Sequence, residues 1–147
     1  MEKNWEDALT SLKVGSSGGR PAVHKPLLVL MLIARAQSGK GNTVAYKDVA
    51  DDLASAIQQF GGAKKANAAL PFVHLQSEGF WKVREGEDEY KKSGKALKDA
   101  VGEVDARLWK ELVSKPEMAK RVAKRLLEKY LPSDVRGQVT AKLGLKT

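Results

Sequence analysis

The sequence predicts a mainly α-helical fold with a small central β-sheet or hairpin, an α+β arrangement in one compact domain. Apolar residues recur at helical spacing in several segments, and a short alternating, aromatic stretch lies near the middle of the chain. Clusters of glycine and serine separate these segments. The length of 147 residues suits a single domain, so we expect residues 1–147 to fold together. The order helix, short strand, helix and hairpin also suits a winged-helix-like domain.

Two helices are predicted on either side of a flexible turn. Residues 4–13 carry apolar side chains at helical spacing, and the "GSSGG" stretch that follows is typical of a turn or loop. Pro26 suits the first position of the second helix, which we expect to end at Gln37. The continuous apolar run from Leu27 to Ala34 indicates that this helix is buried nearly all round.

The middle of the chain is predicted to contain the strands. "TVAY" indicates a short strand, and a helix follows from Tyr46 to Phe60, ended by two glycines. The segment "LPFVHLQSEGFWKV", from Leu70 to Val83, is predicted as two strands or as a strand and a hairpin arm. Residues 91–104 are expected to form a loop around Ser93 and Gly94 and then a helix from Lys95.

The last third of the chain is predicted to be helical. "DARLWKELV" indicates one helix, and Pro116 starts another that runs to Tyr130 with an apolar stripe and a largely basic remaining surface. A final helix is expected near the C-terminal end, capped by Ser133.

Composition excludes several kinds of site. The chain has no cysteine, so disulfides and thiolate metal ligands are excluded. With only two histidines, His24 and His74, neither a zinc site nor a nuclease site built on several histidines can be assembled. We therefore expect no metal and no cofactor. The longest apolar run is too short to span a bilayer and no signal peptide opens the chain, so we expect a cytoplasmic protein without a membrane partner.

The positive charge of the chain is unevenly distributed. The formal net charge is +8, which suits a polyanionic partner. No acidic residue occurs between Ala8 and Lys47, nor between Leu53 and Ser77, and both histidines fall inside these two windows. We expect the two windows to form one positive face. The alternative is an ordinary solvated surface on which the charges cluster by chance.

The start of the second helix is a candidate anion site. The residue before Pro26 is Lys25, which cannot accept a hydrogen bond from the helix N-terminus as a capping residue would. The free N–H groups of Leu27 and Leu28 would then meet Lys25, with Arg20 nearby, at a spot suited to phosphate. The alternative is that water or a backbone carbonyl satisfies the helix end and that Lys25 is simply solvated.

The segment around Pro71 supplies a second candidate element. A proline followed by an aromatic residue, here Phe72, is usually a packing feature. His74 lies in an apolar run, where a histidine is more often a core residue than a ligand. The functional interpretation is that Leu70, Pro71 and His74 line a small, partly apolar surface next to the anion site.

Three stretches together resemble a known family. In order and spacing, "SSGGRPAVHKPLLVLMLIARA", "LPFVHLQSEGFWKV" and "LLEKYLPSDVRGQVTAKLGL" resemble the sulfur-binding domain of phosphorothioate-dependent type IV restriction endonucleases. That prokaryotic domain recognises DNA in which a sulfur replaces one non-bridging backbone oxygen. The resemblance covers nearly the whole chain.

The resemblance implies roles for particular residues. Lys25, with His24 beside it, would contact the modified phosphate. Pro71 and the later position His74 would cup the sulfur, whereas Leu70 stands where the family has a tyrosine. The wider DNA-binding surface is expected to include Arg20 and Phe72. Candidates for base contacts flank the predicted hairpin: Lys64, Lys65 and Asn67 before it, and Lys92, Ser93 and Lys95 after it.

These observations predict a module that binds double-stranded phosphorothioate DNA without cutting it. In the family such a domain is joined to an HNH or other nuclease domain, and this sequence shows no nuclease motif. Three alternatives stay open: a winged-helix-like regulator that binds unmodified DNA, a small nuclease using His24 and His74 as acid and base, and an interaction domain that does not bind DNA. The sequence leaves the oligomeric state open.

Overall fold

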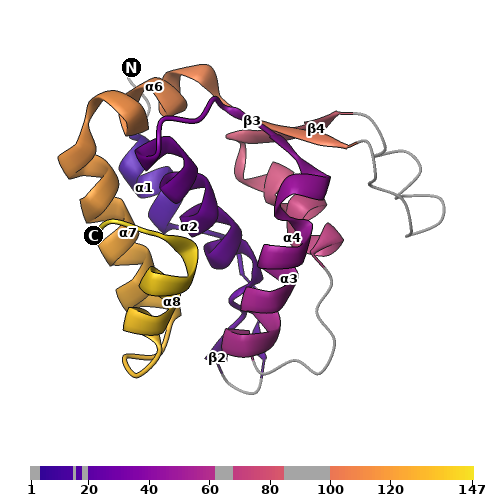
Figure 1. Cartoon of the computed structure of the whole chain (residues 1–147), viewed down its shortest axis with the longest axis vertical. Helices are drawn as coiled ribbons and strands as arrows, with labels where there is room; N and C mark the ends of the chain where they lie inside the picture. The colour runs from indigo at the N-terminus through magenta and orange to yellow at the C-terminus, as the bar shows by residue number, and fades with distance from the viewer. Residues whose placement is uncertain (1–3, 15, 18–19, 62–67, 85–99) are drawn as a thin grey trace.

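The structure is a computed structural model that describes residues 4–14, 16–17, 20–61, 68–84 and 100–147. Helices dominate it, and one small sheet lies at one end of the helical body (Figure 1). The mainly α-helical α+β fold is therefore confirmed. In chain order the elements are α1 (Trp5–Thr10), β1 (Ser16–Ser17), β2 (Arg20–Pro21), α2 (His24–Gln37), β3 (Thr43–Ala45), α3 (Tyr46–Gly61), α4 (Ala69–His74), the 3₁₀ turn η1 (Leu75–Glu78), β4 (Trp81–Arg84), β5 (Val101–Val104), α6 (Ala106–Ser114), α7 (Pro116–Tyr130) and α8 (Arg136–Leu143).

Helix α2 forms the centre of the core. It packs against α3 and α4 on one side and against α6 and α7 on the other, and Figure 1 shows it running through the middle of the molecule. Every residue from Pro26 to Ala34 is buried, as the continuous apolar run predicts. Because removing apolar surface from water is the main favourable term in folding, α2 holds the surrounding helices together. Its first turn carries His24 and Lys25 and therefore has a fixed position.

The sheet has three antiparallel strands in the order β3-β5-β4. Trp81 of β4 pairs with Val104 of β5, and Thr43 of β3 pairs with Glu103. Gly102 lies under the Trp81 indole, where a Cβ atom would fall 1.9 Å from the ring. Only glycine at this position lets the indole lie across β5. A separate two-stranded ribbon pairs β1 with β2.

The prediction of two strands in residues 70–83 is wrong for its first half. Residues 69–74 form α4 and residues 75–78 continue as η1, so only Trp81–Arg84 is a strand. Pro71 lies in the first turn of α4, where its missing N–H would have no partner in the helix anyway. The Trp81 indole N–H donates to the carbonyl oxygen of Phe72 at 2.7 Å, which fixes α4 against the sheet.

Other boundaries also differ from the prediction. Val101–Val104 is the strand β5 and not part of a helix, because it pairs with strands on both sides. The expected loop at residues 93–94 and the expected helix start at Lys95 lie outside the described residues. Helix α1 ends at Thr10, before the predicted end at residue 13. Ser133 does not cap α8, which begins at Arg136 after Val135, with no side-chain capping bond.

Candidate nucleic-acid interface

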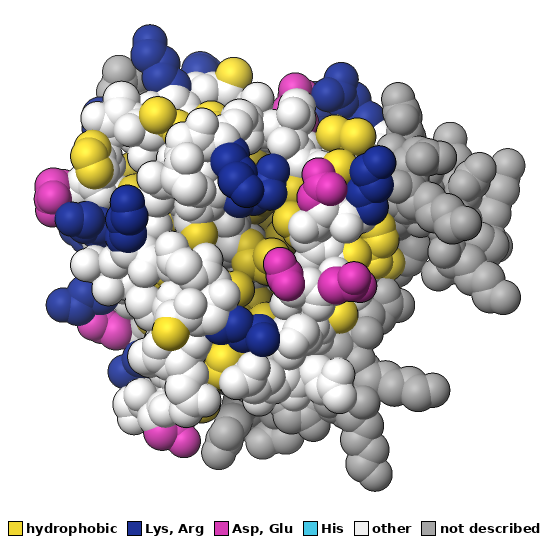
Figure 2. Space-filling view, viewed as in Figure 1, with side chains coloured by type: hydrophobic (Ala, Val, Ile, Leu, Met, Phe, Trp, Pro, Cys, Tyr) yellow, Lys and Arg dark blue, Asp and Glu magenta, His cyan; other side chains and the backbone are white. Residues whose placement is uncertain are grey.

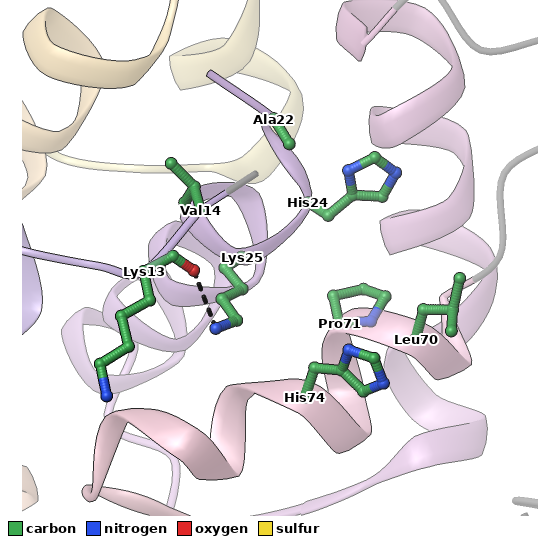
Figure 3. A pocket seen from close by; sticks show the side chains of 8 residues that line it. All are labelled: Lys13, Val14, Ala22, His24, Lys25, Leu70, Pro71 and His74. Carbon is green, nitrogen blue, oxygen red and sulfur yellow. Dashed lines mark hydrogen bonds between the residues drawn. The ribbon is translucent and has the colours of Figure 1, made fainter. Parts of the chain in front are cut away.

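Three separate segments meet at one small pocket, a cavity of about 130 Å³. The segment after α1 contributes one edge, the start of α2 contributes a second, and α4 contributes the opposite wall (Figure 3). The lining residues are Lys13, Val14, Ala22, His24, Lys25, Leu70, Pro71 and His74. The two acid-free windows of the sequence therefore do come together here.

The helix end beside the pocket differs from the expected anion site. Helix α2 begins at His24, two residues before the predicted start at Pro26. The N–H of Leu27 donates to the carbonyl oxygen of Val23 at 2.9 Å, so it is not free to bind a phosphate. His24 itself is half-buried in the pocket wall, and this burial lowers the pKa of its imidazole below the ordinary value.

Lys25 is neither solvated nor a free cation. Its ammonium donates to the carbonyl oxygen of Lys13 at 2.9 Å, to Ser77 Oγ at 3.1 Å and to Glu78 Oε2 at 2.9 Å. The side chains of the Lys25–Glu78 ion pair are only 14% and 4% exposed. No acidic residue lies in the first turn of α2, as predicted, but the predicted free N–H of Leu27 is wrong. The alternative is right that a backbone carbonyl satisfies this helix end, and wrong that Lys25 is simply solvated.

Sequence reasoning missed Glu78. It stands immediately after the second acid-free window and lies 53 residues from Lys25 in the chain, so no local pattern joins the two. The same carboxylate oxygen also accepts the backbone N–H of Lys13 at 2.9 Å. Glu78 therefore ties the end of η1 to two of the three segments that line the pocket.

Helix α4 forms the most apolar part of the pocket wall. The ring of Pro71 lies between the imidazoles of His24 and His74 in Figure 3, with Leu70 beside it. Leu70 is 42% exposed, which is unusual for a large apolar side chain in this protein. His74 is exposed, so the alternative of a core histidine is wrong.

Phe72 does not belong to this surface, although the sequence placed it there. It is fully buried on the other face of α4, and its ring packs edge-on against Tyr46 and Trp81 with centroid distances of 5.1 Å in both pairs. The aromatic residue after Pro71 is thus a packing feature, and it fixes the helix whose outer face lines the pocket.

The remaining predicted site residues lie outside the part of the structure that is described. Arg20 falls in β2, but only its backbone is described. None of the candidates for base contacts lies in a described segment: Lys64, Lys65, Asn67, Lys92, Ser93 and Lys95. The pocket is therefore the part of the predicted interface whose geometry the structure defines.

The basic surface of α7 is largely engaged within the protein. Arg121 and Arg125 both form ion pairs with Glu6, and Lys129 donates to the carbonyl oxygen of Thr10. Figure 2 shows basic and acidic side chains interspersed on the face it draws, with no single positive patch. These contacts stabilise the packing of α1 on α7 and leave α7 a weaker candidate for DNA contacts than its sequence indicates.

Neither a metal-binding cluster nor a membrane-spanning helix is found among the described residues. No group of three or more histidine and acidic side chains there could hold a metal ion. Within the same residues, no helix is long and apolar enough to cross a membrane.

Comparison with solved structures shows the same fold in DNA complexes. The sulfur binding domain of ScoMcrA complexed with phosphorothioated DNA matches with a TM-score of 0.80 and 20% identity, covering 98% of this chain and 97% of that one. The sulfur binding domain of SprMcrA complexed with phosphorothioated DNA matches with a TM-score of 0.79 and 18% identity, over 96% and 92% of the two chains. The type IV phosphorothioation-dependent restriction endonuclease ScoMcrA matches with a TM-score of 0.77 and 20% identity, over 97% of this chain and 32% of that one.

A match to a family model decides the assignment. No curated protein matched the chain. The family model of the ScoMcrA-like DNA sulfur-binding domain, however, matches residues 2–147. It spans all the elements that build the pocket and confirms the resemblance carried by the three sequence stretches. This chain belongs to the family of ScoMcrA-like DNA sulfur-binding domains.

Proposed function

We propose that this chain is a DNA-binding module that recognises double-stranded DNA carrying a phosphorothioate in its backbone. Family membership over residues 2–147 supports this function, and the matched domains of ScoMcrA and SprMcrA were solved with such DNA. The observation that carries the proposal is the pocket itself. It brings an apolar wall, formed by Leu70 and Pro71, against His24 and Lys25 within about 130 Å³.

Such a pocket suits sulfur better than oxygen. Sulfur is larger, more polarizable and less strongly hydrated than a phosphate oxygen, so an apolar wall gains by covering it. An ordinary phosphate oxygen at the same place would lose its hydration without gaining a hydrogen bond from the wall. One apolar group in a pocket discriminates by roughly 1–3 kcal/mol, which is the preference we expect from Pro71 and Leu70 together.

The polar residues around the wall are proposed to hold the phosphate. Lys25, His24 and His74 lie within the pocket lining, and a positively charged or N–H-bearing edge favours the anionic group whichever atom it carries. Leu70 occupies the position where the family has a tyrosine, so this edge offers no phenolic hydroxyl and is more apolar. Base contacts are proposed to come from Lys64, Lys65, Asn67, Lys92, Ser93 and Lys95, outside the described residues.

The module is proposed to bind without catalysing a reaction. ScoMcrA, of which the matched region is 32%, is a type IV phosphorothioation-dependent restriction endonuclease. By analogy, this chain supplies recognition, and a nuclease domain or partner protein supplies cleavage. The alternative of a regulator that binds unmodified DNA is not favoured, because the matched family is defined by sulfur binding.

A paired binding assay tests the proposal. Two duplexes of identical sequence are compared, one with a single backbone phosphorothioate and one without. We expect tighter binding of the sulfur-containing duplex by roughly 1–3 kcal/mol. Equal affinities for the two duplexes would instead support the regulator of unmodified DNA.

A further inference from the structure

The ammonium group of Lys25 has no hydrogen atom left to offer a ligand. A lysine ammonium carries three donors, and all three are used, on Lys13 O, Ser77 Oγ and Glu78 Oε2. The Glu78 carboxylate also balances the charge of Lys25, and both side chains are largely withdrawn from solvent. Before any ligand binds, the positive charge of Lys25 is therefore balanced and all three of its hydrogen-bond donors are occupied.

This saturation is built into the fold. Glu78 accepts the backbone N–H of Lys13 as well as the Lys25 ammonium, so its carboxylate is held even when the lysine moves. Ser77 Oγ donates to the carbonyl oxygen of His74 at 3.0 Å, which leaves its lone pairs facing Lys25. Figure 3 shows the Lys13 ammonium pointing away from Pro71, so it does not replace the missing donor.

We infer that Glu78 is a specificity-determining residue, which makes the pocket select sulfur by withholding the Lys25 donors from an ordinary phosphate oxygen. This inference rests on the proposed function. A phosphate oxygen that enters the pocket needs a strong donor to replace its lost water, and Lys25 offers none while Glu78 holds it. Sulfur is a weak hydrogen-bond acceptor, so it loses little when Lys25 offers no donor.

Charge and hydrogen bonding contribute differently to this selection. A net positive charge beside a phosphate acts on modified and plain DNA alike, because both groups are anions. A free N–H donor acts mainly on oxygen, the better acceptor. Removing the negative charge of Glu78 should therefore strengthen binding to both DNAs, and to plain DNA by more.

The experiment compares wild-type protein with Glu78→Gln on the paired duplexes over a salt series. The neutral amide keeps the shape and can still accept from Lys13, but it holds the ammonium too weakly to compete with a phosphate. We expect plain DNA to bind about tenfold tighter, the scale of one hydrogen bond to a charged group. Sulfur-containing DNA should gain about threefold or less, and the salt slope should steepen by about one for both.

Two further variants separate the effect of net charge on DNA binding from the effect of a free Lys25 hydrogen-bond donor. Glu117→Gln on α7 makes the same change in net charge at a side chain that is 84% exposed, and should leave the sulfur preference unchanged. Ser77→Ala releases one Lys25 donor without changing the charge. It should tighten plain DNA by about threefold and leave the salt slope as it is. Ser77 is exposed, so this variant keeps the test available if Glu78→Gln fails to fold.

The outcomes distinguish this inference from the function on which it rests. A folded Glu78→Gln protein that keeps the wild-type sulfur preference, or that loses affinity for both DNAs equally, overturns the inference and makes Glu78 a structural support of Lys25. If only Ser77→Ala can be measured, a sulfur preference equal to that of the wild type also overturns the inference. A wild-type protein with no preference for sulfur overturns the proposed function as well.

Discussion

The backbone N–H of Leu12 donates to the hydroxyl of Tyr130 at 2.9 Å, in a buried contact between the N-terminal segment and the end of α7. The same hydroxyl lies 3.2 Å from the carbonyl oxygen of Thr10, to which it can donate. Lys13 and Val14, which line the pocket, follow Leu12 directly. The last residue of α7 thus fixes an edge of a pocket whose other walls come from α2 and α4.

Replacing Tyr130 with phenylalanine tests this anchor. Tyr130→Phe leaves the buried N–H of Leu12 without a partner, so the free energy of unfolding should fall by about 1–3 kcal/mol in urea denaturation. Ser114→Ala, which removes an exposed hydroxyl bonded to Lys110 O, is the control and should change stability by less than about 0.5 kcal/mol. Equal stability of Tyr130→Phe and the wild type would show that the contact does not support the fold.

Pro71→Ala should remove most of the preference for sulfur. Alanine is compatible with the first turn of α4, but it lacks the ring atoms that face the pocket. Affinity for sulfur-containing DNA should fall by about 1–3 kcal/mol, while the weaker binding to plain DNA stays roughly constant. Pro116→Ala, at the start of α7, is the matched control. A variant with native circular dichroism and full sulfur preference would place the sulfur contact elsewhere.

Lys25→Ala should weaken binding to both kinds of DNA. It removes the ammonium and leaves the buried Glu78 carboxylate unpaired, facing the incoming phosphate. Because the Lys25–Glu78 pair then carries a net negative charge, the slope of affinity against salt should become shallower by about one. Lys124→Ala removes the same charge from the exposed surface of α7 and should change binding little. Loss of sulfur-specific binding alone in Lys25→Ala would argue against a role for its charge.

Purified protein should not cleave DNA. No metal-binding cluster occurs among the described residues, and no serine, threonine or cysteine is among the described residues that line the pocket with His24 and His74. We expect no nicking of plain or phosphorothioate plasmid with magnesium, manganese or zinc ions present. Nicking that persists through purification and disappears in His24→Ala would instead identify a nuclease.

The stability of the protein should fall in mildly acid solution because of His24. Burial lowers the pKa of its imidazole in the folded protein, so the unfolded chain binds a proton there more readily. The free energy of unfolding should therefore decrease as the pH falls below about 6.5, the ordinary histidine pKa, until the folded-state pKa is passed. In His24→Gln this part of the decrease should vanish. Parallel pH curves for the two proteins between pH 7 and 5 would contradict the assignment.

The sequence predicts best where local pattern and tertiary packing agree. The helices from Tyr46 and from Pro116 have strong apolar periodicity, and the structure places them where the pattern does. Residues 70–78 were mistaken for β-structure because their aromatic and β-branched side chains serve packing between α4 and the sheet. Such tertiary contacts override local β-propensity, and they cannot be recognised from a single sequence.

The site was only partly predictable for the same reason. The sequence predicts Pro71 and His74 next to Lys25, and in the structure all three line one pocket. The pairing of Lys25 with Glu78 joins elements far apart in the chain, and no periodicity or spacing predicts it. The roles of these residues in DNA binding stay predictions.

The burial of Phe72 bears on how fast the protein can bind. Because its ring is held between Tyr46 and Trp81, the outer face of α4 needs no rearrangement before a ligand contacts Pro71. Little conformational entropy is then lost at this wall on association. The association rate should accordingly be set by diffusion and electrostatic steering, and differences between modified and plain DNA should appear in the dissociation rate, as residence time.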